Sequence, residues 1–194
     1  MPDGTLLLTG RGRLLTPRPY DGPGPWAIFV RDGLFAWVGP LADAPAADST
    51  VDLGTALVTP GLVDAHTHPA FAGDRSDEAA ARLEGAAYSG GGILRTVAAT
   101  RAASDDDLRA LTGARLRASL ASGVTTIECK SGYGLSTGEE LRALRLIGEA
   151  ADGLPIRVVR TFLGAHAVPP EAASSAEYAA VVAVPKSMTI SGAR

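Results

Sequence analysis

A chain of 194 residues in which 46% are apolar can bury a substantial core, so we expect one or two globular domains. Its 18 basic and 21 acidic residues give a net charge of −3 without a basic run, which excludes the electrostatic footprint of nucleic-acid or anionic-membrane binding. The apolar residues 6 to 8 are too few for a signal peptide or spanning helix, and a single cysteine, Cys129, excludes an internal disulfide. We expect a cytoplasmic protein that binds a small molecule, with no nucleic acid and no membrane; a homo-oligomer stays open.

Residues 1 to 59 have the pattern of short strands and turns, which predicts an N-terminal β subdomain. The clearest signal is Asp32-Gly33 between two apolar segments, residues 27 to 31 and 34 to 38. A type I′ turn needs positive φ at both central residues, which aspartate and glycine tolerate, so the pattern favours a β-hairpin.

Residues 60 to 182 alternate between strand and helix patterns, which predicts an α/β fold with parallel strands. Strands are expected near residues 58–68, 124–129 and 156–163. Helices are expected at 78–83, after Ser104 with Asp107 as an acidic capping box, and after Thr137 with Glu140 as a second box. The carboxyl ends of the strands would then open into the active site.

His66 and His68 stand one residue apart at the end of the first predicted strand. Side chains alternate faces along a strand, so both imidazoles point the same way and can share one metal ion. The alternative is a pair of strand histidines held by ordinary hydrogen bonds. A catalytic zinc or iron usually has three or four protein ligands, so this pair predicts only part of a ligand set. Asp64 is expected to orient a histidine or a turn.

The second predicted strand ends in three residues with chemistry of their own. Glu128 and Lys130 share a face by alternation, which predicts a structural ion pair. Cys129 has the opposite parity and is expected to pack in the core.

Four motifs carry a resemblance to a known family: TPGLVDAHTH at residues 59–68, FAGDR at 71–75, ECKSGYGL at 128–135 and TFLGAHAVPP at 161–170. The first resembles the opening barrel strand of the amidohydrolase superfamily, and together they resemble the imidazolonepropionase family from about residue 50 to 182. The resemblance implies an α/β fold that is the N-terminal part of a (βα)8 TIM barrel, its first three or so βα units. A small β-sandwich-type subdomain, composite and lacking its C-terminal strands, would precede them over residues 1–59.

The resemblance also implies roles for single residues. His66 and His68 would bind one divalent metal, zinc or iron, and Arg75 would bind the propanoate carboxylate of 4-imidazolone-5-propanoate. Tyr133 and His166 would contact the ring. The implied reaction is metal-assisted opening of a cyclic amide to N-formimino-L-glutamate, in histidine degradation. A guanidinium fork suits a planar carboxylate, and a phenol and an imidazole suit a heterocycle with donors and acceptors.

The three residues expected to bind the substrate each have an alternative, purely structural role. Arg75 could form a solvated ion pair, Tyr133 could serve packing, and His166 could satisfy backbone groups near residues 169 and 170.

The chain departs from the family in length and in one loop. A full βα barrel takes about 250 residues, and the family's later metal ligands and general base have no counterpart here, so no catalytic residue is assigned. The loop between Tyr88 and Gly90 is shorter than in the family, and residues 183–194 form a divergent tail that a frameshift would explain. Two rivals stay open: an amidohydrolase or deaminase for another cyclic amide or heterocycle, and a non-catalytic fragment.

Overall fold

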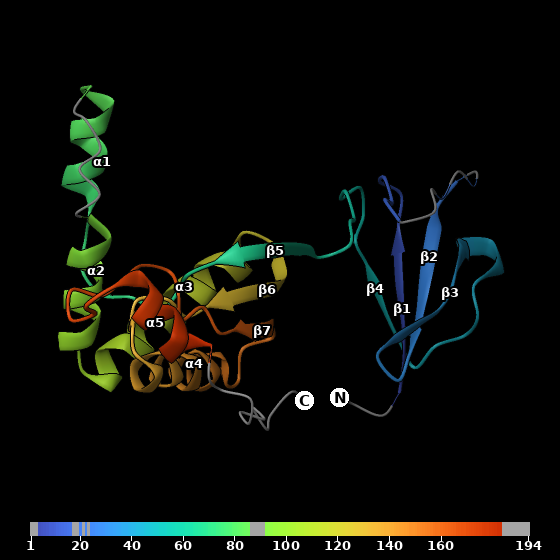
Figure 1. Ribbon diagram of the computed structural model, residues 1–194. Helices are drawn as coiled ribbons and strands as arrows, with labels where there is room; N and C mark the ends of the chain where they lie inside the picture. The colour runs from blue at the N-terminus through green and yellow to red at the C-terminus, as the bar shows by residue number, and fades with distance from the viewer. Residues whose placement is uncertain (1–3, 17–19, 21, 23, 86–91, 184–194) are drawn as a thin grey trace. The chain divides into compact units, whose positions relative to one another are not determined.

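The computed structural model describes residues 4–16, 20, 22, 24–85 and 92–183 (Figure 1). The shortened loop between Tyr88 and Gly90 and the divergent tail after Ala183 lie outside the described residues. The chain divides into two compact units, residues 1–60 and 61–194.

The first unit contains one four-stranded sheet in the order β3-β2-β1-β4. Its central pair, β1 and β2, is antiparallel, as are β2 and β3, while β4 runs parallel to β1. The described strands and the 3-10 helix η1 have these bounds: β1 Thr5–Gly10, β2 Trp26–Arg31, β3 Leu34–Pro40, η1 Leu41–Asp43 and β4 Ser49–Asp52.

The predicted hairpin joins β2 to β3. Asp32 and Gly33 have φ of 52° and 73°, the positive values that a type I′ turn needs, so the prediction is confirmed. Side chains alternate faces along β2, so Ala27 and Phe29 lie on one face of the sheet and Trp26 and Ile28 on the other. The first pair is buried in one apolar cluster and the second pair in another. In the described part of this unit all four strands belong to this one sheet, and the composite sandwich stays a prediction.

The second unit is built on three parallel strands in the order β5-β6-β7, as the alternating pattern predicts. Their bounds are β5 Leu62–Thr67, β6 Val124–Lys130 and β7 Arg157–Thr161. Five helices are described: α1 Ser76–Leu83, α2 Gly92–Ala102, α3 Asp105–Ala121, α4 Thr137–Ala151 and α5 Ser175–Val182.

Helices α3 and α4 pack beside the strands and close the core of this unit (Figure 1). The core members that are at most 2% exposed are Leu116 of α3, Ile127 and Cys129 of β6, and Leu144 and Ile147 of α4. Leu144 and Ile147 are three residues apart and so lie on the same face of α4. Burial of such an apolar face holds an amphipathic helix against a sheet.

The two predicted capping boxes have different outcomes. Ser104 does begin α3, since its hydroxyl accepts a hydrogen bond from the N–H of Asp107 at 3.1 Å. The second prediction is wrong: α4 is capped by Ser136, whose hydroxyl accepts from the N–H of Glu139 at 3.3 Å. Glu140 is fully buried, because the apolar stripe of α4 passes through its position.

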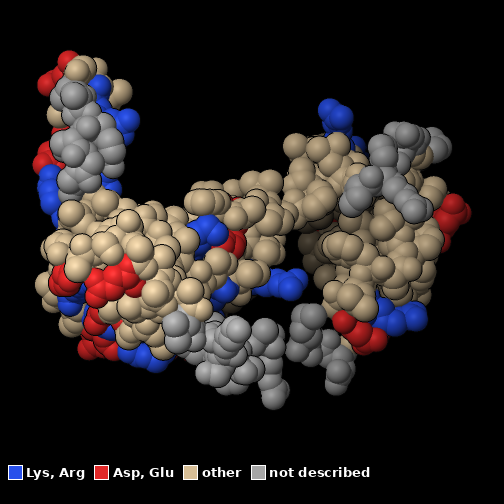
Figure 2. All heavy atoms as spheres, viewed as in Figure 1, with Lys and Arg blue, Asp and Glu red and all other residues tan. Residues whose placement is uncertain are grey.

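Acidic and basic side chains are interspersed on the face of the molecule seen in Figure 2, in keeping with the small net charge. Among the described residues, no helix combines the length and the apolarity that crossing a bilayer requires.

Candidate functional site at the carboxyl ends of the strands

The site residues converge at one edge of the β5-β6-β7 sheet. His66 lies in β5 and His68 follows its last residue, Tyr133 lies in the loop after β6, and His166 lies in the loop after β7. Three parallel strands thus deliver four side chains to the same place, the carboxyl edge where α/β proteins position their ligands.

The four rings form one contact cluster. His66 and His68 have ring centroids 5.4 Å apart, and His68 stacks on His166 at 4.7 Å with an interplanar angle of 22°. The ring of Tyr133 lies 5.7 Å from that of His68 and 5.3 Å from that of His166. His68 is therefore the centre of the cluster, in contact with all three other rings.

The surroundings of His68 favour a neutral imidazole. Burial lowers the pKa of His68, and the neighbouring His166 and His66 lower it further. Its Nδ1 is buried and makes no hydrogen bond to any described residue. A neutral imidazole with an unsatisfied nitrogen is the form that binds a metal ion.

These residues fit part of a metal-ligand set. His66 and His68 supply two neighbouring imidazole donors, but within the described ranges no group of three or more histidine, cysteine, aspartate or glutamate side chains could hold a metal ion. A complete catalytic site would need further ligands. Asp64, on the same strand, accepts a hydrogen bond from the backbone N–H of His66 at 3.3 Å.

The residues that end β6 have the roles predicted from strand parity. Glu128 and Lys130 form the expected ion pair, with both side chains only 16% exposed. Burial by itself would raise the pKa of Glu128, but hydrogen bonds from Lys130 and Thr161 outweigh it and lower that pKa. Cys129 is fully buried, and burial raises the pKa of its thiol to about 11.

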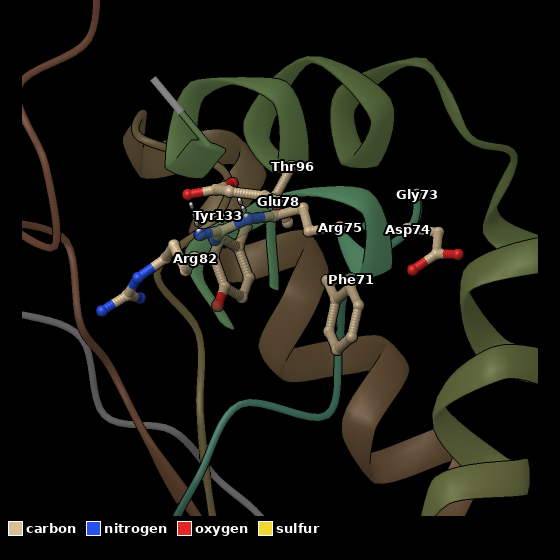
Figure 3. A pocket seen from close by; sticks show the side chains of 8 residues that line it. All are labelled: Phe71, Gly73, Asp74, Arg75, Glu78, Arg82, Thr96 and Tyr133. Carbon is tan, nitrogen blue, oxygen red and sulfur yellow. Dashed lines mark hydrogen bonds and ion pairs between the residues drawn. The ribbon is translucent and has the colours of Figure 1, made fainter. Parts of the chain in front are cut away.

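Arg75 lies in a cavity of about 330 Å³ beside this cluster. Figure 3 shows its guanidinium facing the carboxylate of Glu78, next to the ring of Tyr133. The Arg75 side chain is 34% exposed, so the ion pair is only partly solvated. The cavity is lined by Phe71, Gly73, Asp74, Arg75, Glu78, Arg82, Thr96 and Tyr133.

Tyr133 connects the cavity with the ring cluster. Its phenol is half-buried, and burial raises its pKa although Arg75 and Arg115 oppose the shift. The hydroxyl therefore keeps its proton at neutral pH and can act as a hydrogen-bond donor to a ligand.

His166 is oriented by the Tyr133 loop. Its Nδ1 lies 3.0 Å from the carbonyl oxygen of Gly132, which leaves Nε2 for other contacts if Nδ1 carries the proton. Gly132 has φ of 122°, and a Cβ built on it would lie 2.8 Å from Nδ1 of His166. Glycine is thus needed at this position for both the backbone conformation and the approach of the ring.

Two residues that position the site were missed by sequence reasoning. Arg115 of α3 donates to the carbonyl oxygens of Pro69 and Phe71, at 2.7 Å each, and its guanidinium lies 3.6 Å above the Phe71 ring. Glu140 accepts hydrogen bonds from backbone N–H groups of the Tyr133 loop. The sequence does contain a signal for both, because each is a charged residue at a position that continues the apolar face of its helix. Arg115 lies seven residues after Leu108 in α3, and Glu140 lies three residues before Ala143 in α4.

The sequence is similar to curated imidazolonepropionases. It is 51% identical to the one from Salinispora tropica over 174 residues, 46% identical to that of Mycolicibacterium smegmatis over 177, and 52% identical to that of Pseudomonas putida GB-1 over 158. These alignments cover 86%, 88% and 78% of this chain but 42%, 43% and 39% of the relatives. The chain therefore spans about two fifths of the length of the relatives it matches. No family model matches.

Solved structures of other hydrolases share the fold. The chain resembles N-isopropylammelide isopropylaminohydrolase from Burkholderia multivorans, with a TM-score of 0.50 and 23% identity, over 80% of this chain and 36% of that one. It also resembles an atrazine chlorohydrolase variant from Arthrobacter aurescens TC1 complexed with zinc and atraton, with a TM-score of 0.54 and 21% identity, over 80% and 35% of the two chains. At this identity the likeness shows a shared α/β fold and nothing finer.

Proposed function

We propose that this chain carries the N-terminal part of the active site of an imidazolonepropionase, which hydrolyses 4-imidazolone-5-propanoate to N-formimino-L-glutamate. Its α/β unit would be the first three or so βα units of a TIM barrel, from residue 60 to 182, and residues 1–59 would belong to a composite β subdomain. The observation that carries the proposal is the convergence of His66, His68, His166 and Tyr133 beside the Arg75 cavity. The identity to imidazolonepropionases supports it. We infer a cytoplasmic location from the single, buried cysteine.

His66 and His68 would hold one divalent metal ion, zinc or iron. Their adjacent rings and the unsatisfied, buried Nδ1 of His68 support this assignment. When bound, such an ion supplies Lewis-acid chemistry for hydrolysis of a cyclic amide. Lys130 lies near enough to contribute to the lowered pKa of His68, which helps to keep that imidazole neutral for a ligand role.

Arg75, Tyr133 and His166 would bind the substrate. The guanidinium of Arg75 would hold the propanoate carboxylate in a bidentate pair. The protonated phenol of Tyr133 and Nε2 of His166 would contact the polar atoms of the ring, and the stack between His166 and His68 brings these contacts next to the metal ligands.

A second candidate function is hydrolysis or deamination of a different heterocycle. The fold likeness to an atrazine chlorohydrolase and an isopropylaminohydrolase favours it. Binding assays with a heterocycle that carries a short carboxylate separate the two candidate functions. A triazine substrate has no carboxylate for Arg75 to bind. We expect the isolated chain to show little hydrolysis by itself, because no group of three or more histidine, cysteine, aspartate or glutamate side chains among its described residues could hold a metal ion.

Metal binding by the purified chain tests the proposal. We expect titration calorimetry to detect binding of Zn²⁺ by the purified chain, and His66→Ala and His68→Ala each to weaken that binding. Cys129→Ser serves as the matched control, because that thiol is the only cysteine in the chain and is fully buried. A wild-type chain that binds no zinc, or zinc binding that is unchanged in both histidine variants, would contradict the assignment.

A further inference from the structure

The guanidinium of Arg75 already holds a carboxylate. Its Nε lies 3.0 Å from Oε2 of Glu78 and its Nη2 lies 3.3 Å from Oε1, a two-point pair (Figure 3). This is the geometry in which a guanidinium binds any planar carboxylate, including that of a small ligand. The two residues are three apart, with Arg75 at the N-cap of α1 and Glu78 in its first turn.

The Glu78 carboxylate is much less exposed than a carboxylate in a typical surface ion pair. Its side chain is 18% exposed, whereas the neighbouring Asp77, which pairs with Arg95, is 66% exposed. Gly92, the first residue of α2, leaves the space: a Cβ built there would lie 1.9 Å from Oε2 of Glu78 and 2.7 Å from Nε of Arg75. The start of α2 thus forms one wall of the position that the carboxylate fills.

We propose that Glu78 is a specificity-determining residue: its carboxylate occupies the anion position of Arg75, and a ligand carboxylate binds by exchange with it. The inference rests on the proposed function, which assigns Arg75 to the ligand's carboxylate. Arg82 lies one helical turn beyond Glu78, in the wall of the same cavity and at (i, i+4) spacing from it.

Exchange determines which ligands bind. One carboxylate replaces another on the same donors, so the Arg75 pair contributes little net free energy of binding. That free energy must then come from the remainder of the ligand, through contacts with Tyr133 and the rings beyond it. The site therefore selects a planar heterocycle with a short carboxylate arm and rejects small carboxylates that lack a ring.

Titration calorimetry with imidazole-4-propanoate and with plain propanoate tests the exchange. We expect Glu78→Gln to bind imidazole-4-propanoate about tenfold more tightly than the wild type, which is about 1.4 kcal/mol, and to bind propanoate where the wild type does not. Asp77→Asn, which removes the same negative charge at the adjacent residue, is the matched control and should leave both affinities unchanged. Glu78→Ala repeats the test in case the glutamine variant fails to fold, as judged by circular dichroism.

The outcomes separate this inference from the function on which it rests. Equal or weaker binding of imidazole-4-propanoate by both Glu78 variants overturns the exchange. If in that case Arg75→Ala still weakens binding by the wild type, the role of Arg75 survives and only the inference fails. If Arg75→Ala has no effect on the affinity of Glu78→Gln for either carboxylate, both the inference and the role of Arg75 are wrong.

Discussion

Glu140 in helix α4 reaches back to Gly132, eight residues earlier, and accepts a hydrogen bond from its backbone N–H. The other carboxylate oxygen accepts from the N–H groups of Gly134 and Leu135, at 2.9 and 2.6 Å. Leu135 has a positive φ of 53°, a conformation that costs a non-glycine residue free energy and persists when its surroundings fix it. One buried carboxylate thus fixes the loop that presents Tyr133.

Glu140→Gln should destabilise the fold. The amide keeps one accepting oxygen, but its NH₂ group would face a backbone N–H that then has no acceptor in a fully buried position. We expect the free energy of unfolding in urea to fall by about 2 kcal/mol. Glu139→Gln, the same change at the adjacent and partly exposed residue, should cost less than about 0.5 kcal/mol. Equal losses in the two variants would contradict the role given to Glu140.

The Glu140 contact also marks where sequence reasoning stops. The pairing of Asp32 with Gly33 and the cap at Ser104 were predictable, because each depends on residues within a few positions of one another. Convergence of His66, His68, Tyr133 and His166 was also predictable, since parallel strands align their carboxyl ends.

What sequence reasoning could not predict depends on tertiary contacts. Helix α2 was missed because it begins at Gly92, directly after two other glycines that give no start signal. The partners of charged side chains, such as Glu78 for Arg75 or the Tyr133 loop for Glu140, follow from packing and not from spacing. The three-residue spacing from Thr137 to Glu140 matches a capping box, and Glu140 was therefore predicted to cap the helix. Its position also continues the buried face of α4 formed by Ala143 and Ile147, and this second pattern is the one that the structure follows.

Arg115→Met tests the support beneath the first site loop. The substitution keeps an apolar chain but removes two hydrogen bonds, to the carbonyl oxygens of Pro69 and Phe71, and the stack on the Phe71 ring. We expect a loss of about 2 to 3 kcal/mol in the free energy of unfolding, measured in urea. Arg117→Met on the exposed side of the same helix is the control and should change stability by no more than about 0.5 kcal/mol. A stability loss in Arg115→Met no greater than in the control would refute the contact.

Cys129 should resist thiol reagents in the folded chain. Burial raises its pKa from 9.0 to about 11, so at pH 8 about a hundredfold less thiolate is present than in an ordinary cysteine. We expect iodoacetamide labelling at pH 8 to be slower by at least this factor than in urea, and its rate to increase as the pH rises toward 11. Mass spectrometry of the intact chain gives the extent of labelling. Rapid labelling without denaturant would show that the thiol is accessible and ionised.

The ion pair between Glu128 and Lys130 should contribute more to stability at neutral than at acidic pH. Both side chains are only 16% exposed, so Lys130→Met leaves a largely buried carboxylate without its counter-charge. We expect that variant to lose about 3 kcal/mol in the free energy of unfolding at pH 7, and the double variant Glu128→Gln with Lys130→Met to lose less. The folded-state pKa of Glu128 lies below its usual 4.5, so the contribution of the pair is complete above that value and is lost as the pH falls through the folded-state pKa. Urea unfolding of the wild type and both variants from pH 7 to pH 3 measures this, and a stability difference between the wild type and Lys130→Met that does not shrink toward pH 3 would rule the pair out as its source.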